Sequence, residues 1–317
     1  MGESAAALPD GPSTVNSWLA SLGGKLAERW LVTLMLPGVA FVGAAALALT
    51  LGHGHWSDTA LLRAELDRLA ASPAARGGAA TLLVTLGLVT LAVASSAAAQ
   101  GIEQLMVRIW TGPWGRYGRP LVRRRRRRWD EAAARHEDAL REKARLLRSA
   151  RQPGPGPVTT PDTVATAAAR DRIAPTRPQR PTWTGDRMLA VGERVRTAYD
   201  LDLATVWPRL WLVLPDEVRV PLAQAQTAFT AAARTAAWGI LYLALGLWWW
   251  PAAAIGTAVL ALGRWRGRES MEHLAELVES AVDLHVHTLA AALGHRPDGP
   301  FTPADGESVT RTLRKGY

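Results

Sequence analysis

Cysteine is absent from the 317-residue chain, which excludes disulfide bonds and thiolate chemistry. Charged side chains are also absent from three long stretches: Trp30–Gly52, Gly77–Ile102 and the 29 residues 235–263. Each stretch is longer than the roughly 18 apolar residues at which a transmembrane helix is the expected structure. The sequence therefore predicts an all-α fold, namely a transmembrane helical bundle with helical cytoplasmic extensions and disordered linkers.

Asp, Glu, Lys, Arg and His do not occur inside these three stretches, whereas ion-coupled carriers normally bury such groups as relays or binding sites. The chain also lacks the motifs of P-loop nucleotide binding, serine hydrolases and zinc proteases. His53 and His55 form an H-x-H pair without a third metal ligand nearby, so we interpret them as interfacial polar residues. We expect no enzyme activity, no cofactor and no metal site.

No cleavable signal peptide is expected at the N-terminus. The first apolar stretch begins only at Trp30, and it is too long for a signal sequence, whose apolar region has about 7–15 residues. We predict that it remains as a membrane anchor.

The net charge of +9 is concentrated in one segment. Residues 103–234 carry 25 basic and 14 acidic side chains, a net charge of +11, and the excess begins directly after the second apolar stretch. Basic residues flanking a membrane span are typical of the cytoplasmic side. We therefore place residues 103–234 in the cytoplasm, so that the first span runs outward and the second returns.

The third apolar stretch, 235–263, raises a question of topology. As a single helix it would be about 44 Å long, against about 30 Å of hydrocarbon core, and its three tryptophans would lie near the midplane. As a hairpin that turns at Trp248–Pro251, it would place these tryptophans at the outer interface and return Arg264 to the cytoplasm. We favour the hairpin, which gives four spans with cytoplasmic N- and C-termini.

Tryptophan collects at the two bilayer interfaces, which gives a second line of evidence on topology. The predicted interfacial anchors are Trp30, Trp56, Trp110, Trp114, Trp248, Trp249, Trp250 and Trp265. Trp56 and Trp248–Trp250 belong to the outer interface in this interpretation.

The chain is thus divided into ten predicted segments. They are a cytoplasmic N-terminal segment (1–29), a first span (30–52), an external loop with a short amphipathic helix (53–76), a second span (77–102), a basic cytoplasmic helix (103–151), a proline-rich disordered linker that can contain a brief helix at 163–172 (152–183), a cytoplasmic or interfacial helical segment (184–234), a transmembrane hairpin (235–263), a cytoplasmic amphipathic helix (264–294) and a disordered tail (295–317).

Two cytoplasmic stretches carry apolar patterns. The sequence "LATVWPRLWLVL" (203–214) is too short to span a membrane, and either an interfacial segment or a small buried core fits it. In the helix predicted after the hairpin, Met271, Leu274, Val278 and Leu289 form an apolar stripe that can pack on other cytoplasmic helices or on a second subunit.

The strongest local signal is a run of six arginines. These are Arg123, Arg124, Arg125, Arg126, Arg127 and Arg128. The run is sufficient as a topological signal alone, and it can also attract anionic lipid headgroups at about 1 kcal/mol per basic residue. Nucleic acid phosphates respond to the same charge. The adjacent membrane makes lipid the nearer partner and nucleic acid the unlikely one.

The stretches "VWPRLWLVLPDEVR" and "WGILYLALGLWWWPAAAIG", with "IWTGPWGRYGRPLVRRRRRRW", resemble a family of uncharacterised multi-span integral membrane proteins of actinomycete bacteria. The resemblance implies a bacterial cell membrane and supplies no activity, ligand or site residue. The favoured function is a non-catalytic anchor or adaptor that binds anionic lipid or a cytosolic protein. The alternative is an oligomeric pore or membrane-perturbing effector, because the charge-free spans are rich in small residues that permit close helix contacts.

Overall fold

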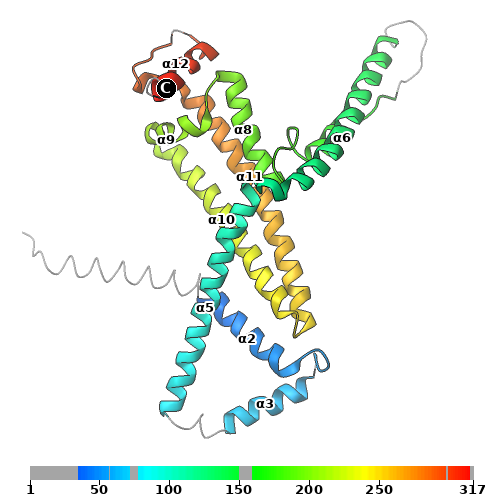
Figure 1. Ribbon diagram of the computed structural model, residues 1–317, viewed down its shortest axis with the longest axis vertical. Helices are drawn as coiled ribbons and strands as arrows, with labels where there is room; N and C mark the ends of the chain where they lie inside the picture. Colours follow the sequence, from blue (N-terminus) through cyan, green and yellow to red (C-terminus); the bar gives the residue numbers. More distant parts are fainter. Residues whose placement is uncertain (1–34, 57, 72–77, 150–158, 298, 315–317) are drawn as a thin grey trace, which may run out of the picture. The chain divides into compact units, whose positions relative to one another are not determined.

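The computed structural model describes residues 35–56, 58–71, 78–149, 159–297 and 299–314, and these ranges contain helices, turns and loops without a strand. The helices, labelled in Figure 1, are α2 (Leu36–Leu51), α3 (Thr59–Ala71), α5 (Gly78–Thr111), α6 (Gly115–Ser149), α7 (Thr163–Asp171), α8 (Trp183–Tyr199), α9 (Leu203–Val213), α10 (Asp216–Leu245), α11 (Trp250–Ala292) and α12 (Pro303–Leu313). The predicted all-α class is confirmed for the described residues.

The chain forms two compact units. Unit 1 comprises Met1–Ile102 with Ala237–Leu260, and unit 2 comprises Glu103–Ala236 with Ala261–Tyr317. The helices α5, α10 and α11 each contribute one part to unit 1 and another part to unit 2.

Two of the described helices, α5 and α10, are long and apolar enough to cross a membrane, judged by length and composition. The helix α2 is apolar but has only 16 residues, and residues 30–34 of the predicted first span lie outside the described residues. The apolar start of α11 is also short, because Arg264 follows within the same helix. The structure thus supports two candidate spans where the sequence predicts four.

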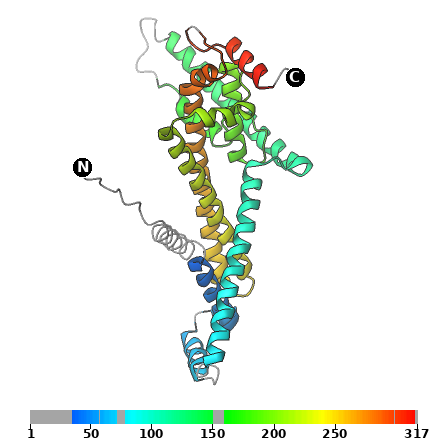
Figure 2. The same ribbon diagram turned by 90° about the vertical axis from the view of Figure 1, so that its left-hand side faces the viewer.

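The segment 235–263 folds as two helices. The helix α10 ends at Leu245 and α11 begins at Trp250, with Pro251 in its first turn, where the absent proline N–H costs nothing. The two helices lie side by side in both Figure 1 and Figure 2. They approach so closely at Gly256 that a Cβ there would lie 2.6 Å from the backbone nitrogen of Leu243. The predicted helix break at Trp248–Pro251 is therefore confirmed.

Small and aromatic residues pack the described part of unit 1. Ala48 of α2, Leu245 of α10 and Ala252 of α11 form its buried cluster. The ring of Phe41 lies 5.4 Å from the ring of Tyr242, edge to face, which is a favourable geometry for aromatic pairs. Gly38 allows α2 to contact α5, because a Cβ at this position would overlap the carbonyl oxygen of Ala92.

The apolar part of α5 leaves most of its large side chains exposed within the chain. These side chains include Leu82, Leu83, Val84, Leu86 and Leu91, each more than half exposed. Soluble monomers rarely leave a contiguous apolar surface of this length in water. Such a surface is expected of a helix that crosses a membrane, which agrees with α5 as a candidate span.

The core of unit 2 joins α8, α9, α10, α11 and α12. Val206, Leu210 and Leu214 are almost completely buried in it, whereas Leu212 is 77% exposed. The stretch "LATVWPRLWLVL" therefore contributes one face to a buried core, which is one of the two structures that fit its sequence. Met271 and Leu289 of the predicted α11 stripe are each at most 2% exposed, which confirms the stripe as a packing face.

The tail predicted to be disordered contains the helix α12. Thr302 caps it: the Thr302 side chain accepts from the backbone N–H of Asp305, and the Asp305 carboxylate accepts from that of Thr302. Val309 is 1% exposed in the unit 2 core, and a Cβ at Gly306 would overlap the carbonyl oxygen of Tyr199. The prediction of disorder is wrong for 303–313, because the few apolar residues of this segment find partners that are distant in sequence.

Candidate lipid-headgroup site on helix α6

The six arginines of the run lie on α6, which is separated from α5 by the non-helical residues Gly112–Trp114. The indole Nε1 of Trp114 donates to the carbonyl of Ile109 at 2.8 Å across this non-helical segment, and Gly115 adopts a positive φ of 51°. One candidate span is thus followed within a few residues by the most basic helix of the chain.

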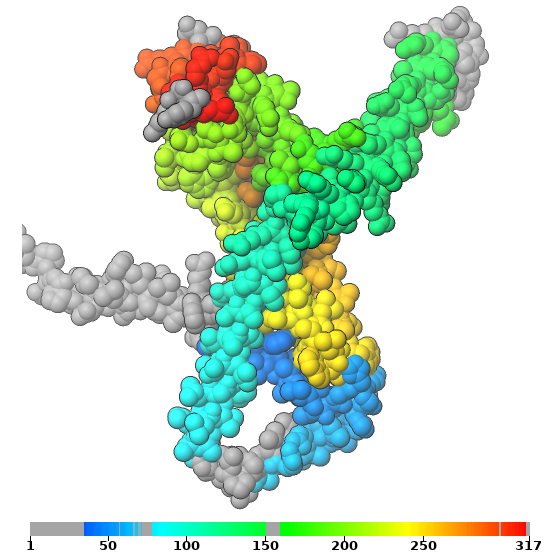
Figure 3. All heavy atoms as spheres, viewed as in Figure 1, coloured from blue at the N-terminus to red at the C-terminus, as the bar shows by residue number. Residues whose placement is uncertain are grey.

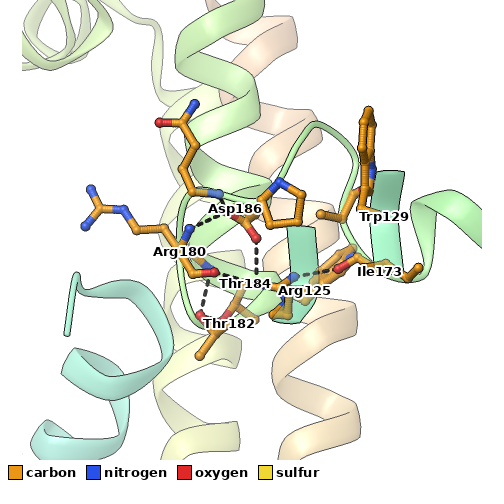
Figure 4. Close-up of polar contacts among 12 residues, drawn as sticks. Arg125, Trp129, Ile173, Arg180, Thr182, Thr184 and Asp186 are labelled. Carbon is orange, nitrogen blue, oxygen red and sulfur yellow. Dashed lines mark hydrogen bonds and ion pairs between the residues drawn. The ribbon is translucent and has the colours of Figure 1, made fainter. Parts of the chain in front are cut away.

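Arg125 does not face solvent with the rest of the run. Its Nη1 lies 2.6 Å from the Asp186 carboxylate and 2.6 Å from the carbonyl oxygen of Arg180, and its Nη2 donates to the carbonyl of Ile173 at 2.5 Å (Figure 4). Only 17% of the Arg125 side chain and 2% of the Asp186 side chain are exposed. Arg125 is therefore a structural residue, and its predicted role at the headgroup surface is wrong.

Asp186 receives the Arg125 guanidinium and two further donors. Its Oδ1 accepts from the backbone N–H groups of Gln179 and Arg180 at 2.8 and 2.7 Å. Burial raises the pKa of the Asp186 carboxyl above its usual range, although these donors and Arg125 favour the charged form. Burial likewise lowers the pKa of the Arg125 guanidinium. A buried ion pair of this kind destabilises the fold strongly when one partner is removed.

Two neighbours of Arg125 on α6 hold the same proline-rich loop. The Arg126 Nε donates to the carbonyl of Pro178 at 2.7 Å, and the Trp129 Nε1 donates to that of Ala174 at 3.0 Å. Figure 3 shows the green segment that follows α6 in sequence packed along that helix. The prediction of disorder is therefore wrong for 159–162 and 172–183, while 150–158 lie outside the described residues. The brief helix predicted at 163–172 within this linker is confirmed as α7.

The physical reason is that proline removes backbone donors but leaves every carbonyl free. A proline-rich loop cannot satisfy those carbonyls within itself. In this chain the α6 side chains supply the missing donors, so the loop is ordered by a partner about 50 residues away in sequence, as the separations of the bonding pairs show.

The other arginines of the run remain available. Arg123, Arg124, Arg127 and Arg128 are exposed, and none of them has a hydrogen bond or ion pair with another described residue. The nearest acidic residue on the helix, Asp130, is paired with Arg177 at 3.1 Å. This stretch of α6 therefore presents positive charge without internal compensation.

Part of this charge surrounds a surface cavity of about 350 Å³. Its basic residues are Arg119, Arg123 and Arg126, which follow one another at the four- and three-residue spacing of one helix face. Trp114 lines the cavity, and so do Gln179 and Pro181 of the loop. No carboxylate is among the lining residues. Chemically, three guanidinium groups beside an indole form a receptor for a phosphate ester.

The predicted tryptophan anchors differ in their surroundings. Trp56 and Trp250 are both about half exposed and their rings lie 4.9 Å apart, and Trp249 Nε1 donates to the carbonyl of Trp56 at 3.3 Å. Trp248 is 54% exposed. The structure therefore brings together the tryptophans that the sequence assigns to the outer interface.

The anchors near α6 and beyond the hairpin behave differently. Trp110 is only 7% exposed, packs on Phe229, and lies where a Cβ on Gly267 would overlap its ring. The prediction that Trp110 is a lipid-facing anchor is wrong, because a buried indole cannot reach the bilayer. Trp114 is partly buried at the cavity, Trp265 is 61% exposed, and Trp30 lies outside the described residues.

Several residues of unit 2 were not identified from the sequence. Asp186 gives no local signal, and neither do the pairs Arg187–Glu272 and Arg194–Glu279, which join α8 to α11 at 2.7 and 2.6 Å. In each pair the partners are 85 residues apart, so no spacing rule indicates them. Among the described residues, no group of three or more His, Cys, Asp or Glu side chains is placed to hold a metal ion.

Comparison with known proteins adds no assignment: no family model, curated protein or solved structure matches the chain.

Proposed function

We propose that this chain is a multi-pass protein of the cell membrane and a non-catalytic anchor or adaptor. In this proposal the α6 cavity binds the headgroup of an anionic phospholipid. The observation that carries it is the uncompensated cluster Arg119, Arg123 and Arg126 beside Trp114, on a helix that follows a candidate span. Each planar guanidinium group can donate two hydrogen bonds to the oxygens of one phosphate. A preformed cavity with several such groups therefore binds a headgroup more selectively than a flexible basic tail does.

The proposed topology has four spans, with α2 and the start of α11 completing the set. The contact of Trp56 with Trp249 and Trp250 supports it, because all three would then lie at one outer interface. Unit 2 and both termini would be cytoplasmic. A protease-sensitive tag placed after Tyr317 should survive an impermeant protease in intact cells and be removed after the cells are opened. Removal of the tag in intact cells would contradict this topology.

The lipid assignment is tested on the full chain extracted in a neutral detergent and offered equal amounts of phosphatidylglycerol and phosphatidylcholine. Native mass spectrometry counts the bound lipids. We expect preferential retention of phosphatidylglycerol. In the double variant Arg119→Gln with Arg123→Gln, this preference should fall about thirtyfold, since the two basic residues near a headgroup together contribute about 2 kcal/mol.

The matched control is the double variant Arg124→Gln with Arg128→Gln. It removes the same charge from the same helix, but its residues lie outside the cavity. We expect a clearly smaller loss of the preference in this control. Equal losses in both variants would show that only bulk charge matters, and no preference in the wild type would refute lipid recognition altogether.

The adaptor function also requires a protein-docking surface, for which the far half of α6 is the candidate. Leu140 and Leu147 are about half exposed there, two turns apart on one helix face. Cross-linking in cells from a photoreactive residue at 147 should give one discrete cytosolic adduct, and Leu140→Glu should abolish it. An adduct that persists in this variant would exclude the surface.

A further inference from the structure

A second cavity of unit 2 is separate from the α6 site in residues and in character. Its volume is about 570 Å³, within the usual range for small-molecule sites. Apolar side chains from three helices line it: Met188, Leu189, Leu203, Trp207, Leu274 and Val278. Of these, only Val278 is buried, so the others leave apolar surface facing the hollow.

The charged side chains of this cavity are Arg180, Arg196 and Asp202. Asp202 is already engaged, because it accepts from the Thr205 hydroxyl at 2.7 Å and lies 3.5 Å from Arg314. The Arg196 and Arg180 side chains have no hydrogen bond or ion pair with another described residue, and Figure 4 shows the Arg180 guanidinium directed away from Asp186. The cavity thus combines an apolar lining with two uncompensated cations.

Gly192 of α8 contributes to the empty volume. A Cβ at this position would meet no atom within 4 Å, whereas a Cβ at Gly185, two turns earlier in the same cavity, would lie 3.0 Å from Arg180 Cβ. Glycine is a poor residue for a helix interior, and here its absent side chain is not required by a close backbone contact. The free space at Gly192 is therefore open to an occupant.

We infer that this cavity binds a single-chain anionic amphiphile, such as a fatty carboxylate, with its chain along Leu189 and Trp207 and its carboxylate at Arg180 and Arg196. The apolar lining accommodates an alkyl chain, and the two guanidinium groups complement one negative charge. Thr111, the last residue of the candidate span α5, also lines the cavity. A membrane reservoir for such a ligand rests on the proposed membrane location, whereas binding itself does not.

The test uses the full chain in nanodiscs of zwitterionic lipid and a dodecanoic acid that carries a photoreactive diazirine at the chain end. After irradiation, peptide mass spectrometry should locate the label on α8 and α9. Gly192→Leu should reduce this labelling about tenfold, because the leucine side chain occupies the volume. Its thermal midpoint should be unchanged or higher, since leucine favours the helix over glycine.

The control variant Gly101→Leu makes the same change in α5, where a Cβ also meets nothing within 4 Å, and it should label like the wild type. Arg196→Gln should weaken labelling by the acid about fivefold, because an exposed charge pair contributes roughly 1 kcal/mol. Labelling by a dodecanol probe with the same diazirine should be unaffected.

Three results would overturn the inference. The first is undiminished labelling of Gly192→Leu. The second is labelling by dodecanol as strong as that by the acid, which would exclude a role for the arginines. The third is labelling that appears only after residues 1–29 are removed, which would identify the N-terminal segment as the occupant.

Discussion

The two units of this chain pack by different means. In the described part of unit 1, alanines, glycines and aromatic rings make the contacts between helices, and the single ion pair, Arg68–Glu65, lies within α3. In unit 2, an aliphatic core is accompanied by the buried pair Arg125–Asp186 and by arginine–glutamate pairs between α8 and α11. One sequence thus uses two packing chemistries.

The difference agrees with two solvents. Lipid offers no hydrophobic driving force between helices, so close contact through small residues is the main means of association there. Water makes burial of leucine and valine favourable and also allows charged groups to be placed at the edges of a core. This difference is the one expected from the proposed topology, in which unit 1 lies in lipid and unit 2 in water.

Removal of the Asp186 carboxylate should have the largest effect. Asp186→Ala leaves Arg125 without its partner in a site where 17% of that side chain is exposed, and such a loss costs about 3–5 kcal/mol. We expect the loop 173–182 to exchange its amide hydrogens rapidly, measured by mass spectrometry, while unit 1 stays protected.

The corresponding control is Asp130→Ala. It breaks the exposed pair with Arg177, whose side chain is 63% exposed, and should cost at most about 1 kcal/mol. Equal destabilisation by both substitutions would show that burial does not distinguish the two pairs.

Helix contact in unit 1 should be sensitive to volume rather than to charge. Gly256→Leu places a side chain against the backbone of Leu243 and should destabilise the hairpin by about 1–3 kcal/mol or more. Gly87→Leu, at a position where a Cβ meets nothing within 4 Å, should be neutral. Thermal unfolding in nanodiscs compares the two variants, and the proposed packing fails if Gly256→Leu melts like the wild type.

The smallest effect is expected at α12. Thr302→Ala removes the N-cap side chain and should cost about 1 kcal/mol. The hydroxyl and backbone N–H of Thr302 also donate to the Asp305 carboxylate and lower its pKa, so the contribution of these two hydrogen bonds is present at neutral pH and is lost as the pH falls through the lowered pKa. Hydrogen exchange of 303–313, corrected for intrinsic rates, should rise in the wild type only below about pH 3.8. An unchanged exchange rate in Thr302→Ala would exclude the cap as a determinant.

Local patterns predicted much of the fold. The uncharged stretches, the turn at Trp248–Pro251 and the apolar stripe through Met271 and Leu289 follow from spacing and composition, and the described helices agree with them. The candidate site was predicted in part, since the exposed arginines of α6 lie in the run that the sequence indicates.

The failures share one cause, which is dependence on partners distant in sequence. The loop 172–182 is ordered by donors on α6, α12 is ordered by Tyr199 and the unit 2 core, and Trp110 is buried by Phe229. No composition rule reveals these contacts, because each segment by itself has the features of a linker, a tail or an interface.

The loop carbonyls held by α6 also set a limit on how the arginine run can vary. A lysine in place of Arg125 would keep the positive charge but has a single nitrogen, which cannot reach Asp186, Arg180 and Ile173 in the geometry of a planar fork. No such set of hydrogen bonds requires an arginine at positions 124, 127 and 128. We therefore expect lysine to be tolerated at those three positions during evolution and to be selected against at position 125. The six arginines, although identical in the sequence, are thus under two different constraints.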